Sequence, residues 1–171
     1  MNATPRIYWI TGLPAAGKTT LARALAARLS QDGLQTFVLD GDELRRGLCA
    51  DLGLTDQDRT ENIRRAGEVA RLFVSAGITP ICAFVSPFAA DRQRVRSLFA
   101  PGEFCEIHLN TTLEECIRRD PKGLYAKARL GQIKDLTGWD APYEPPIAPD
   151  FCFDTQTSSL SAILDRIVKT P

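Results

Sequence analysis

Residues 12–19 read Gly-Leu-Pro-Ala-Ala-Gly-Lys-Thr and match G-x-x-x-x-G-K-[ST], the spacing of a phosphate-binding loop. The preceding residues 6–11 are aromatic and β-branched and predict a buried strand. Residues 20–29 are rich in Ala and Leu at helical spacing and predict a helix. This order aims backbone N–H groups and the positive end of a helix dipole at a phosphate. The register and both flanks favour nucleotide binding over a chance glycine turn.

Each part of this loop has an expected task in binding ATP. Gly12 and Gly17 allow the backbone to approach a phosphate closely. Lys18 is expected to reach the β- and γ-phosphates as a catalytic residue, and the Thr19 hydroxyl to bind Mg²⁺. The predicted ATP-binding residues are Gly12, Leu13, Pro14, Ala15, Ala16, Gly17, Lys18, Thr19 and Thr20.

Length and composition limit the classes of protein to which the chain can belong. A chain of 171 residues predicts a single domain over residues 1–171. A net charge of zero gives no global field for nucleic acid or an acidic membrane, so we expect neither partner. Residues 1–5 do not resemble a leader, and the apolar run at 81–85 is too short for a membrane span. Five scattered cysteines without a C-x-x-C pair indicate reduced thiols and a cytoplasmic location.

The rest of the chain alternates predicted strands with predicted helices. After the first strand, further strands are expected at residues 34–39, 78–85, 104–109 and 151–154. After the first helix, further helices are expected at residues 43–49, 58–76, 89–99, 113–118 and 160–168. Parallel strands need such crossover connections. The pattern therefore predicts a three-layer α/β/α fold of the P-loop NTPase type, with a five-stranded parallel sheet in the order 2-3-1-4-5.

Two carboxylates follow the second predicted strand, at the end where open α/β sheets hold their ligands. Asp42 is expected to accept a proton from an attacking hydroxyl, and Asp40 to hold a Mg²⁺-bound water. We place both in the acceptor-binding site. The structural alternative is an Asp N-cap for the helix at 43–49, and both roles are compatible because a cap lies at a helix mouth.

The long predicted helix carries a charged run at its start, where Asp58 is expected to cap it. Arg59 and Asn62, with Arg64 or Arg65, lie on successive turns. Basic side chains at a helix N-terminus oppose the dipole, a cost that a bound anion would offset. A solvated charged face explains the pattern equally well.

Two polar residues near strand ends have structural as well as functional interpretations. Ser86 follows the third predicted strand and either touches a ligand or forms the turn before the next helix. His108, the single histidine, lies in an alternating strand without a partner at metal-ligand spacing. We interpret His108 as structural.

A basic and then irregular segment separates the last two predicted strands. Residues 118–129 carry five basic groups, and residues 131–149 are rich in Gly, Pro and Asp. A long irregular segment in a compact domain is usually functional. We predict a lid over about residues 119–148, with Arg118 and Arg119 among its basic groups, that closes over phosphates and excludes water. The alternative is a mobile surface loop.

The chain resembles the adenylylsulfate kinase family over nearly its whole length. The resemblance rests on the motifs WITGL at 9–13, LDGD at 39–42, DRTENIRR at 58–65, FVSPF at 84–88, RDPKGLY at 119–125, TG at 137–138 and PYEPP at 142–146. Members of this family transfer the γ-phosphoryl group of ATP to the 3′-hydroxyl of adenylyl sulfate (APS), a step in sulfate assimilation. The resemblance implies ATP and Mg²⁺ as cofactors, small nucleotides as substrates and a homodimer.

The resemblance also assigns an acceptor site. It implies that APS is bound by Asp42, Arg45, Arg59, Asn62, Val85, Ser86 and Lys122. The family serine that matches Ser86 is described as a catalytic phosphoserine intermediate. Direct in-line transfer to a hydroxyl, by contrast, needs only Mg²⁺, Lys18, a base and positioning.

Two leucines depart from the family pattern. Family members usually carry aromatic residues at the positions of Leu54 and Leu136, and this pair sandwiches the adenine of the acceptor. Leucine offers apolar contact without stacking, a loss on the order of 1 kcal/mol per face. A kinase of a related nucleotide, such as cytidine diphosphoramidate, is therefore the alternative to an APS kinase. A non-catalytic nucleotide-sensing domain is the second alternative, and the retained Lys18, Thr19 and Asp42 argue against it.

Overall fold

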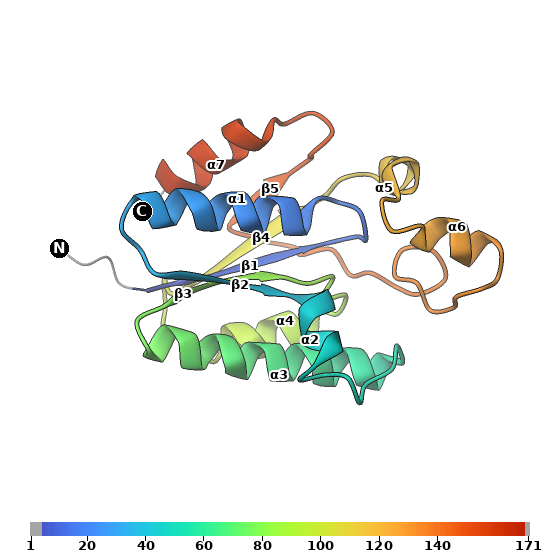
Figure 1. The fold of residues 1–171 in the computed structure, drawn as a ribbon, viewed down its shortest axis with the longest axis horizontal. Coiled ribbons are helices and arrows are strands. Elements are labelled where there is room, and N and C mark those ends of the chain that lie inside the picture. The colour runs from blue at the N-terminus through green and yellow to red at the C-terminus, as the bar shows by residue number, and fades with distance from the viewer. Residues whose placement is uncertain (1–4, 170–171) are drawn as a thin grey trace.

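The computed structural model describes residues 5–169, which form one sheet between two layers of helices (Figure 1). The strands are β1 (Ile7–Gly12), β2 (Thr36–Asp40), β3 (Thr79–Ala83), β4 (Phe104–Leu109) and β5 (Phe151–Phe153). The helices are α1 (Lys18–Gln31), α2 (Gly41–Arg46), α3 (Asp56–Ser75), α4 (Ala89–Arg96), α5 (Leu113–Arg119), α6 (Leu124–Arg129) and α7 (Leu160–Lys169). Residues 1–4, to which the prediction of no leader applies, and residues 170–171 lie outside the described residues.

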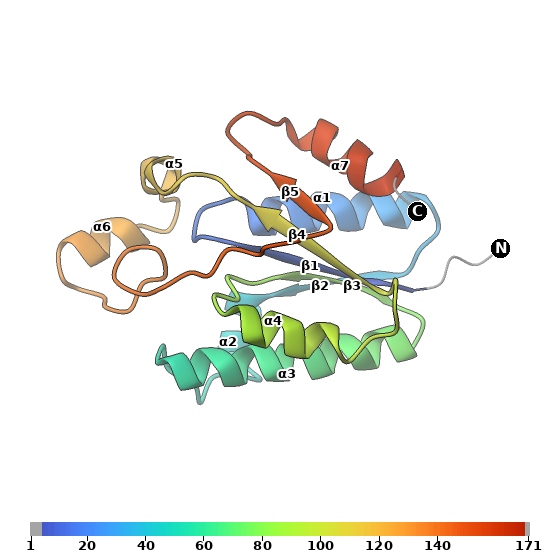
Figure 2. The same cartoon turned by 180° about the vertical axis from the view of Figure 1, so that it is seen from behind.

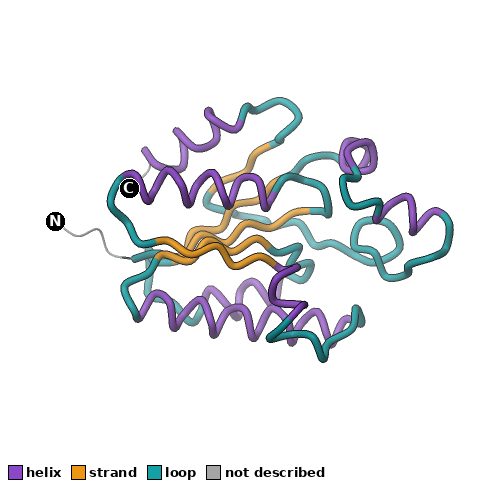
Figure 3. Tube along the Cα trace, in the orientation of Figure 1, coloured by secondary structure: helices purple, strands orange, loops and turns teal. Residues whose placement is uncertain are grey.

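The strands of the described residues follow the order β2-β3-β1-β4-β5, and each neighbouring pair is parallel. The predicted three-layer fold and the sheet order 2-3-1-4-5 are therefore confirmed. Helices α1 and α7 cover one face of the sheet, and α3 and α4 cover the other (Figures 1 and 2). Figure 3 shows the strands in orange between these two purple layers.

Alternation along the central strand β1 divides the core into two halves, because successive side chains point to opposite faces. Tyr8 and Ile10 are buried on the side of α1 and α7. Ile7 and Trp9 are buried on the side of α3 and α4. The first half also holds Leu21, Leu25 and Ile163, and the second holds Ile63, Ala66 and Val95. Because helices cover both faces of the sheet, the sequence of β1 is apolar at successive positions and not only at every second one.

The carboxyl ends of β1, β2 and β3 meet at one edge of the sheet. The phosphate loop follows β1, α2 follows β2, and the irregular segment 84–88 follows β3. The short helices α5 and α6 extend beyond this same edge (Figure 1). Ligands of open parallel sheets bind outside the carboxyl ends of the strands, so this edge is the place to look for a site.

Two predicted helix starts are wrong in detail. Helix α3 begins after Thr55, whose hydroxyl accepts from the Asp58 amide while the Asp58 carboxylate accepts from the Thr55 amide. Asp58 is thus the third helical residue of a capping box and not the cap. Helix α2 spans 41–46 and not 43–49, and its cap is Asp40, whose Oδ1 accepts from the Asp42 amide at 2.9 Å.

The segment predicted as an irregular lid contains a helix. Helix α6 starts after Gly123, whose φ of +66° is left-handed. Its six residues are too few for the hydrophobic periodicity that would have predicted it. The third strand is also shorter than predicted, since residues 84–88 leave the sheet and make no regular structure.

No helix within residues 5–169 combines the length and the apolar composition of a membrane span.

Candidate active site

The phosphate loop has the backbone conformations that its glycines predict. A Cβ on Gly12 would lie 2.6 Å from the carbonyl oxygen of Leu109, so a side chain there would collide with β4. Gly17, the N-cap of α1, has a left-handed φ of +102°. Ala15 also has a positive φ, of +66°, which is uncommon outside glycine. The loop therefore exposes the first turn of α1 and its N–H groups to the edge of the sheet.

Lys18 lies across this loop. Its Nζ donates to the carbonyl oxygens of Gly12 at 2.9 Å and Leu13 at 2.7 Å. Burial, helped by the nearby charge of Lys122, lowers the pKa of Lys18 to about 8. The ammonium is thus held at the loop mouth by acceptors that an anion can replace.

Thr19 and Asp40 form a pair of oxygen donors beside the loop. The Thr19 hydroxyl donates to Asp40 Oδ2 at 2.6 Å, while Oδ1 caps α2. Hard oxygen ligands suit Mg²⁺, which usually keeps several waters and takes only one or two protein oxygens. The pair therefore fits this cation, although the described residues hold no cluster of three or more His, Cys, Asp or Glu side chains.

A cavity of about 720 Å³ connects the phosphate loop with the predicted acceptor residues. From the loop and the start of α1 it is lined by Pro14, Ala15, Gly17, Lys18, Thr19 and Thr20. The predicted acceptor residues that line it are Asp40, Asp42, Arg45, Leu54, Arg59, Asn62, Val85, Ser86, Lys122 and Leu136. The other predicted loop residues, Gly12, Leu13 and Ala16, do not line it. The structure thus brings all the predicted acceptor residues to one cavity.

Asp42 meets a cation from the other side of this cavity. Lys122 comes just before α6 in the chain, and its ammonium forms an ion pair with the Asp42 carboxylate. Both side chains are more than half exposed, so solvent screens the pair. The contact joins residues 80 apart in sequence and draws the segment before α6 towards α2.

The charged run at the start of α3 is divided between the cavity and the surface. Arg59 is buried and donates through Nε to the Leu54 carbonyl, through Nη1 to Thr137 Oγ1, and through Nη2 to the Asp135 carbonyl. Asn62 is also buried, and its Oδ1 accepts no hydrogen bond from the described residues. These two side chains face the cavity, as an anion site requires.

Arg64 and Arg65 instead lie on a charged face outside the cavity, as the alternative interpretation of the same run predicts. Arg64 pairs with Glu61 at 2.7 Å. Arg65 pairs with Asp51 at 2.6 Å and with Glu61 at 2.9 Å. These hydrogen bonds lower the pKa of Glu61 to about 2. Neither arginine lines the cavity.

Ser86 is held in a strained and buried position. Its φ is +40°, a left-handed value for a residue other than glycine, and only 1% of it is exposed. Its hydroxyl accepts from the indole Nε1 of Trp9 at 2.9 Å. The preceding carbonyl, of Val85, accepts from the Thr11 hydroxyl at 2.6 Å. The segment after β3 is therefore a fixed wall of the cavity.

Comparison with known proteins identifies the family. The sequence model of the adenylylsulphate kinase family matches residues 4–154. The chain belongs to the adenylylsulphate kinase family. It is therefore a transferase of the kinase class, and the resemblance predicted from its motifs is confirmed.

The individual relatives agree with this assignment. The adenylyl-sulfate kinase of Marinobacter nauticus is 51% identical over 98% of this chain and 84% of its own length. The Mycobacterium tuberculosis APS kinase, solved in complex with AMPPNP and APS, superposes with a TM-score of 0.92 at 40% identity, over 96% of each chain. A hexameric APS kinase from Thiobacillus denitrificans matches 98% of this chain and 28% of its own, at 32% identity and a TM-score of 0.72.

In this family member the two leucines differ in exposure. Leu54 is 44% exposed at the cavity rim, whereas Leu136 is 8% exposed and packs with the core. Both line the cavity. The apolar contact predicted from the sequence is therefore available on both sides, without an aromatic face on either.

The two predicted lid arginines lie at the end of α5, and only one of their side chains lines the cavity. Both pair with Glu115, Arg118 at 2.6 Å and Arg119 at 2.7 Å. Arg118 is largely exposed and does not line the cavity. Arg119 lines it and donates to Thr155 Oγ1 at 2.7 Å.

Sequence reasoning missed three residues that hold this family member's site together. Thr155 donates to the Ala16 carbonyl at 3.0 Å, and Tyr125 donates to the Pro14 carbonyl at 3.0 Å, so both fix the phosphate loop. Thr137 accepts from Arg59 at 3.0 Å. Tyr125 and Thr137 lie within the family motifs, which could have indicated them. Thr155 follows β5 without any motif to mark it.

His108 makes no contact with the cavity lining that would give it a role there. It is buried, its Nδ1 lies 3.7 Å from Cys152 Sγ, and its ring stacks against Tyr143. Burial lowers its pKa, which favours the neutral ring. These contacts agree with the structural interpretation.

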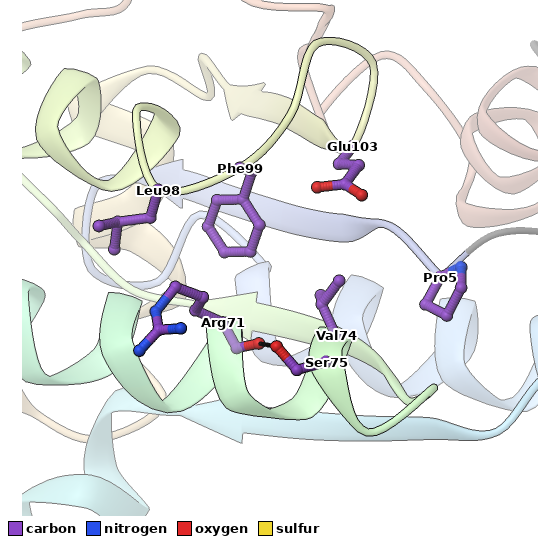
Figure 4. Close-up of a pocket in the computed structure, with 7 residues that line it drawn as sticks. All are labelled: Pro5, Arg71, Val74, Ser75, Leu98, Phe99 and Glu103. Atoms are coloured by element: carbon purple, nitrogen blue, oxygen red, sulfur yellow. Dashed lines mark hydrogen bonds between the residues drawn. The ribbon is translucent and has the colours of Figure 1, made fainter.

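A second pocket, of about 360 Å³, lies between α3 and the segment that joins α4 to β4 (Figure 4). Pro5 lines it from the chain before β1, so it lies at the edge of the sheet opposite the phosphate loop. Its charged side chains have partners, since Arg71 pairs with Glu68 and Glu103 accepts from the Ala100 amide. The pocket therefore presents no free charge to a ligand.

Proposed function

We propose that this chain is an ATP-dependent kinase that phosphorylates the 3′-hydroxyl of APS. The observation that carries the proposal is a single cavity with a phosphate loop at one end and a buried polar wall of Arg59 and Asn62 at the other. Such a cavity can hold a phosphoryl donor and an anionic nucleotide acceptor side by side.

The acceptor wall retains capacity for a ligand. Arg59 uses three of its five N–H donors on the protein, so two remain for a tetrahedral anion. Asn62 Oδ1 is a buried acceptor that needs a donor, and an amino or hydroxyl group of a nucleotide provides one. Arg45 at the rim adds a second guanidinium. These groups match the charge and the polar edges of APS.

We assign the role of general base to Asp42 and the role of phosphate ligand to Lys18. The Asp42 carboxylate lines the cavity beside the Lys122 ammonium, where it can accept a proton from a hydroxyl of the acceptor. Lys18 can exchange its two loop carbonyls for phosphoryl oxygens and neutralise the charge of the transferred group.

We propose that Thr19 and Asp40 hold Mg²⁺ through a hydroxyl and a carboxylate. The cation neutralises phosphate charge when ATP is bound. We assign Ser86 a positioning role, because its hydroxyl is buried and already accepts from Trp9. That environment supports direct in-line transfer over a phosphoserine intermediate.

Three further parts of the proposal concern the whole protein. Residues 119–148 act as a lid, since Lys122 and Tyr125 reach across to α2 and the phosphate loop. The protein works as a homodimer. It resides in the cytoplasm, which agrees with the free state of its five cysteines, four of them buried.

The test is turnover of ATP with each candidate acceptor. The parent protein is expected to form 3′-phosphorylated APS, and Lys18→Ala to lose most of this activity while it stays folded by circular dichroism. Arg118→Ala, outside the cavity, serves as the matched control. A parent that ignores APS but phosphorylates cytidine diphosphoramidate would replace the acceptor assignment, and turnover of neither would favour a nucleotide sensor.

A further inference from the structure

The wall formed by residues 84–88 lies beyond the end of β3, and among the described residues its backbone contact with a neighbouring strand is limited to the Phe84 amide, which donates to the Ile10 carbonyl of β1 at 3.1 Å. Four of its residues line the cavity, namely Phe84, Val85, Ser86 and Pro87. The left-handed φ of Ser86 costs free energy, and such a conformation persists only when the surroundings determine it. Contacts other than strand pairing must therefore fix this segment.

Three consecutive carbonyls of the wall have partners from other parts of the chain. The Val85 carbonyl accepts from Thr11 Oγ1 at 2.6 Å, the Ser86 carbonyl from Arg92 Nη1 at 2.6 Å, and the Pro87 carbonyl from the Glu144 amide at 2.8 Å. Two of these three partners are themselves joined, because Arg92 Nη2 donates to the Glu144 carbonyl at 2.6 Å.

Arg92 is the centre of this arrangement. It is 3% exposed on α4, and its Nε lies 3.1 Å from Glu106 Oε1 on β4. Its guanidinium lies 6.0 Å from the ring of Tyr143, whose hydroxyl is 3.0 Å from Thr11 Oγ1. A buried arginine with its charge paired and its fork on two carbonyls is a rigid support.

We propose that Arg92 is a positioning residue for the acceptor, which fixes the wall at Ser86 to the end of the lid segment at Glu144. It does not touch the cavity itself, so its effect passes through the wall. The inference rests on the proposed function, because it assigns to that wall the task of placing the acceptor. The phosphate loop is held separately, by Tyr125 and Thr155, so binding of ATP is independent of Arg92.

The variant Arg92→Lys tests this role. Its ammonium keeps the charge beside Glu106 but has no planar fork to hold two carbonyls at once. The KM for APS is expected to rise about tenfold, from the loss of charge-assisted hydrogen bonds. The kcat at saturating APS and the KM for ATP are expected to stay within about twofold of the parent values.

Arg96→Lys is the matched control. Arg96 lies on the same helix and pairs with the same Glu106 at 3.3 Å, but it reaches Asp150 and not the wall. All of its kinetic constants are expected to match those of the parent. An equal rise in the KM for APS in both variants would show a general effect of the ion-pair network and overturn the proposal.

Trp9 supplies a readout independent of turnover, because its indole donates to Ser86. In a Trp139→Phe background, which leaves Trp9 as the single tryptophan, Arg92→Lys is expected to shift the emission maximum and Arg96→Lys to leave it unchanged. A second variant, Tyr143→Phe, removes the hydroxyl that contacts Thr11 Oγ1, the donor to the Val85 carbonyl. It is expected to raise the KM for APS two- to threefold.

The outcomes separate the two proposals. A parent without APS turnover contradicts the proposed function, while the Trp9 shift still tests the support of the wall. A parent active on APS, with Arg92→Lys unchanged in both KM and emission, overturns the role of Arg92 alone.

Discussion

Raising the pH above 8 is expected to weaken ATP binding, because Lys18 then loses its proton. Its Nζ lies on the Gly12 and Leu13 carbonyls, and burial lowers its pKa to about 8 in the absence of a nucleotide. A phosphate anion favours the ammonium form, so a protein with neutral Lys18 must take up a proton when ATP binds. Affinity therefore falls as the pH rises through this pKa.

The magnitude follows from the fraction of protein that carries the ammonium. With a pKa of about 8, roughly nine-tenths of Lys18 is protonated at pH 7 and roughly one-tenth at pH 9. The apparent Kd is the intrinsic Kd divided by the competent fraction, so it rises about tenfold over this range. Lys18→Arg stays ionised throughout and is expected to show a flat profile.

Isothermal titration calorimetry with AMPPNP at pH 7 and pH 9 measures this change. Buffers of different ionisation enthalpy report the uptake of the proton directly. The reasoning would be refuted if the Kd of the parent changed by less than about twofold between these pH values. It would also be refuted if the Kd of Lys18→Arg depended on pH as strongly as that of the parent.

The same pKa has the opposite effect on stability. Between pH 8 and 10.5 the unfolded chain binds more protons at Lys18 than the folded protein does. The contribution of Lys18 to the free energy of unfolding therefore rises with pH over this window. In urea unfolding, the free energy of unfolding of the parent minus that of Lys18→Met is expected to rise from pH 8 to 10. A value that stays constant or falls over this range would contradict the lowered pKa.

Three other predictions concern the acceptor, the base and the fold. Asp42→Asn is expected to lower kcat by roughly 10² or more in steady-state assays while the KM for ATP stays near that of the parent; an unchanged kcat would exclude the base role. Leu54→Phe adds an aromatic face at the exposed cavity rim and is expected to lower the KM for APS by up to about tenfold with little change in kcat, because the base is remote from the reacting hydroxyl. Thr55→Ala removes the N-cap of α3 and is expected to lower the free energy of unfolding by about 1 kcal/mol in urea titrations, whereas Ser30→Ala, at an exposed position on α1, is expected to change it little.

The fold class and the position of the phosphate loop could be predicted from the sequence alone. Both depend on local patterns: eight contiguous residues at 12–19, and apolar runs whose period distinguishes strands from helices. The sheet order also followed from the sequence, because crossover rules leave few arrangements for parallel strands. The family motifs indicated the predicted acceptor residues, and in the structure these line one cavity.

Which charged side chains face that cavity, and which residues support its walls, depends on tertiary contacts. The single run of basic residues on α3 is divided, with Arg59 buried at the cavity and Arg65 paired outside, because helix orientation and not spacing selects the inner face. Thr155 reaches Ala16 from 139 residues away. Such hydrogen bonds join segments that are far apart in the sequence and come together only when the sheet forms. Local sequence patterns therefore do not predict them.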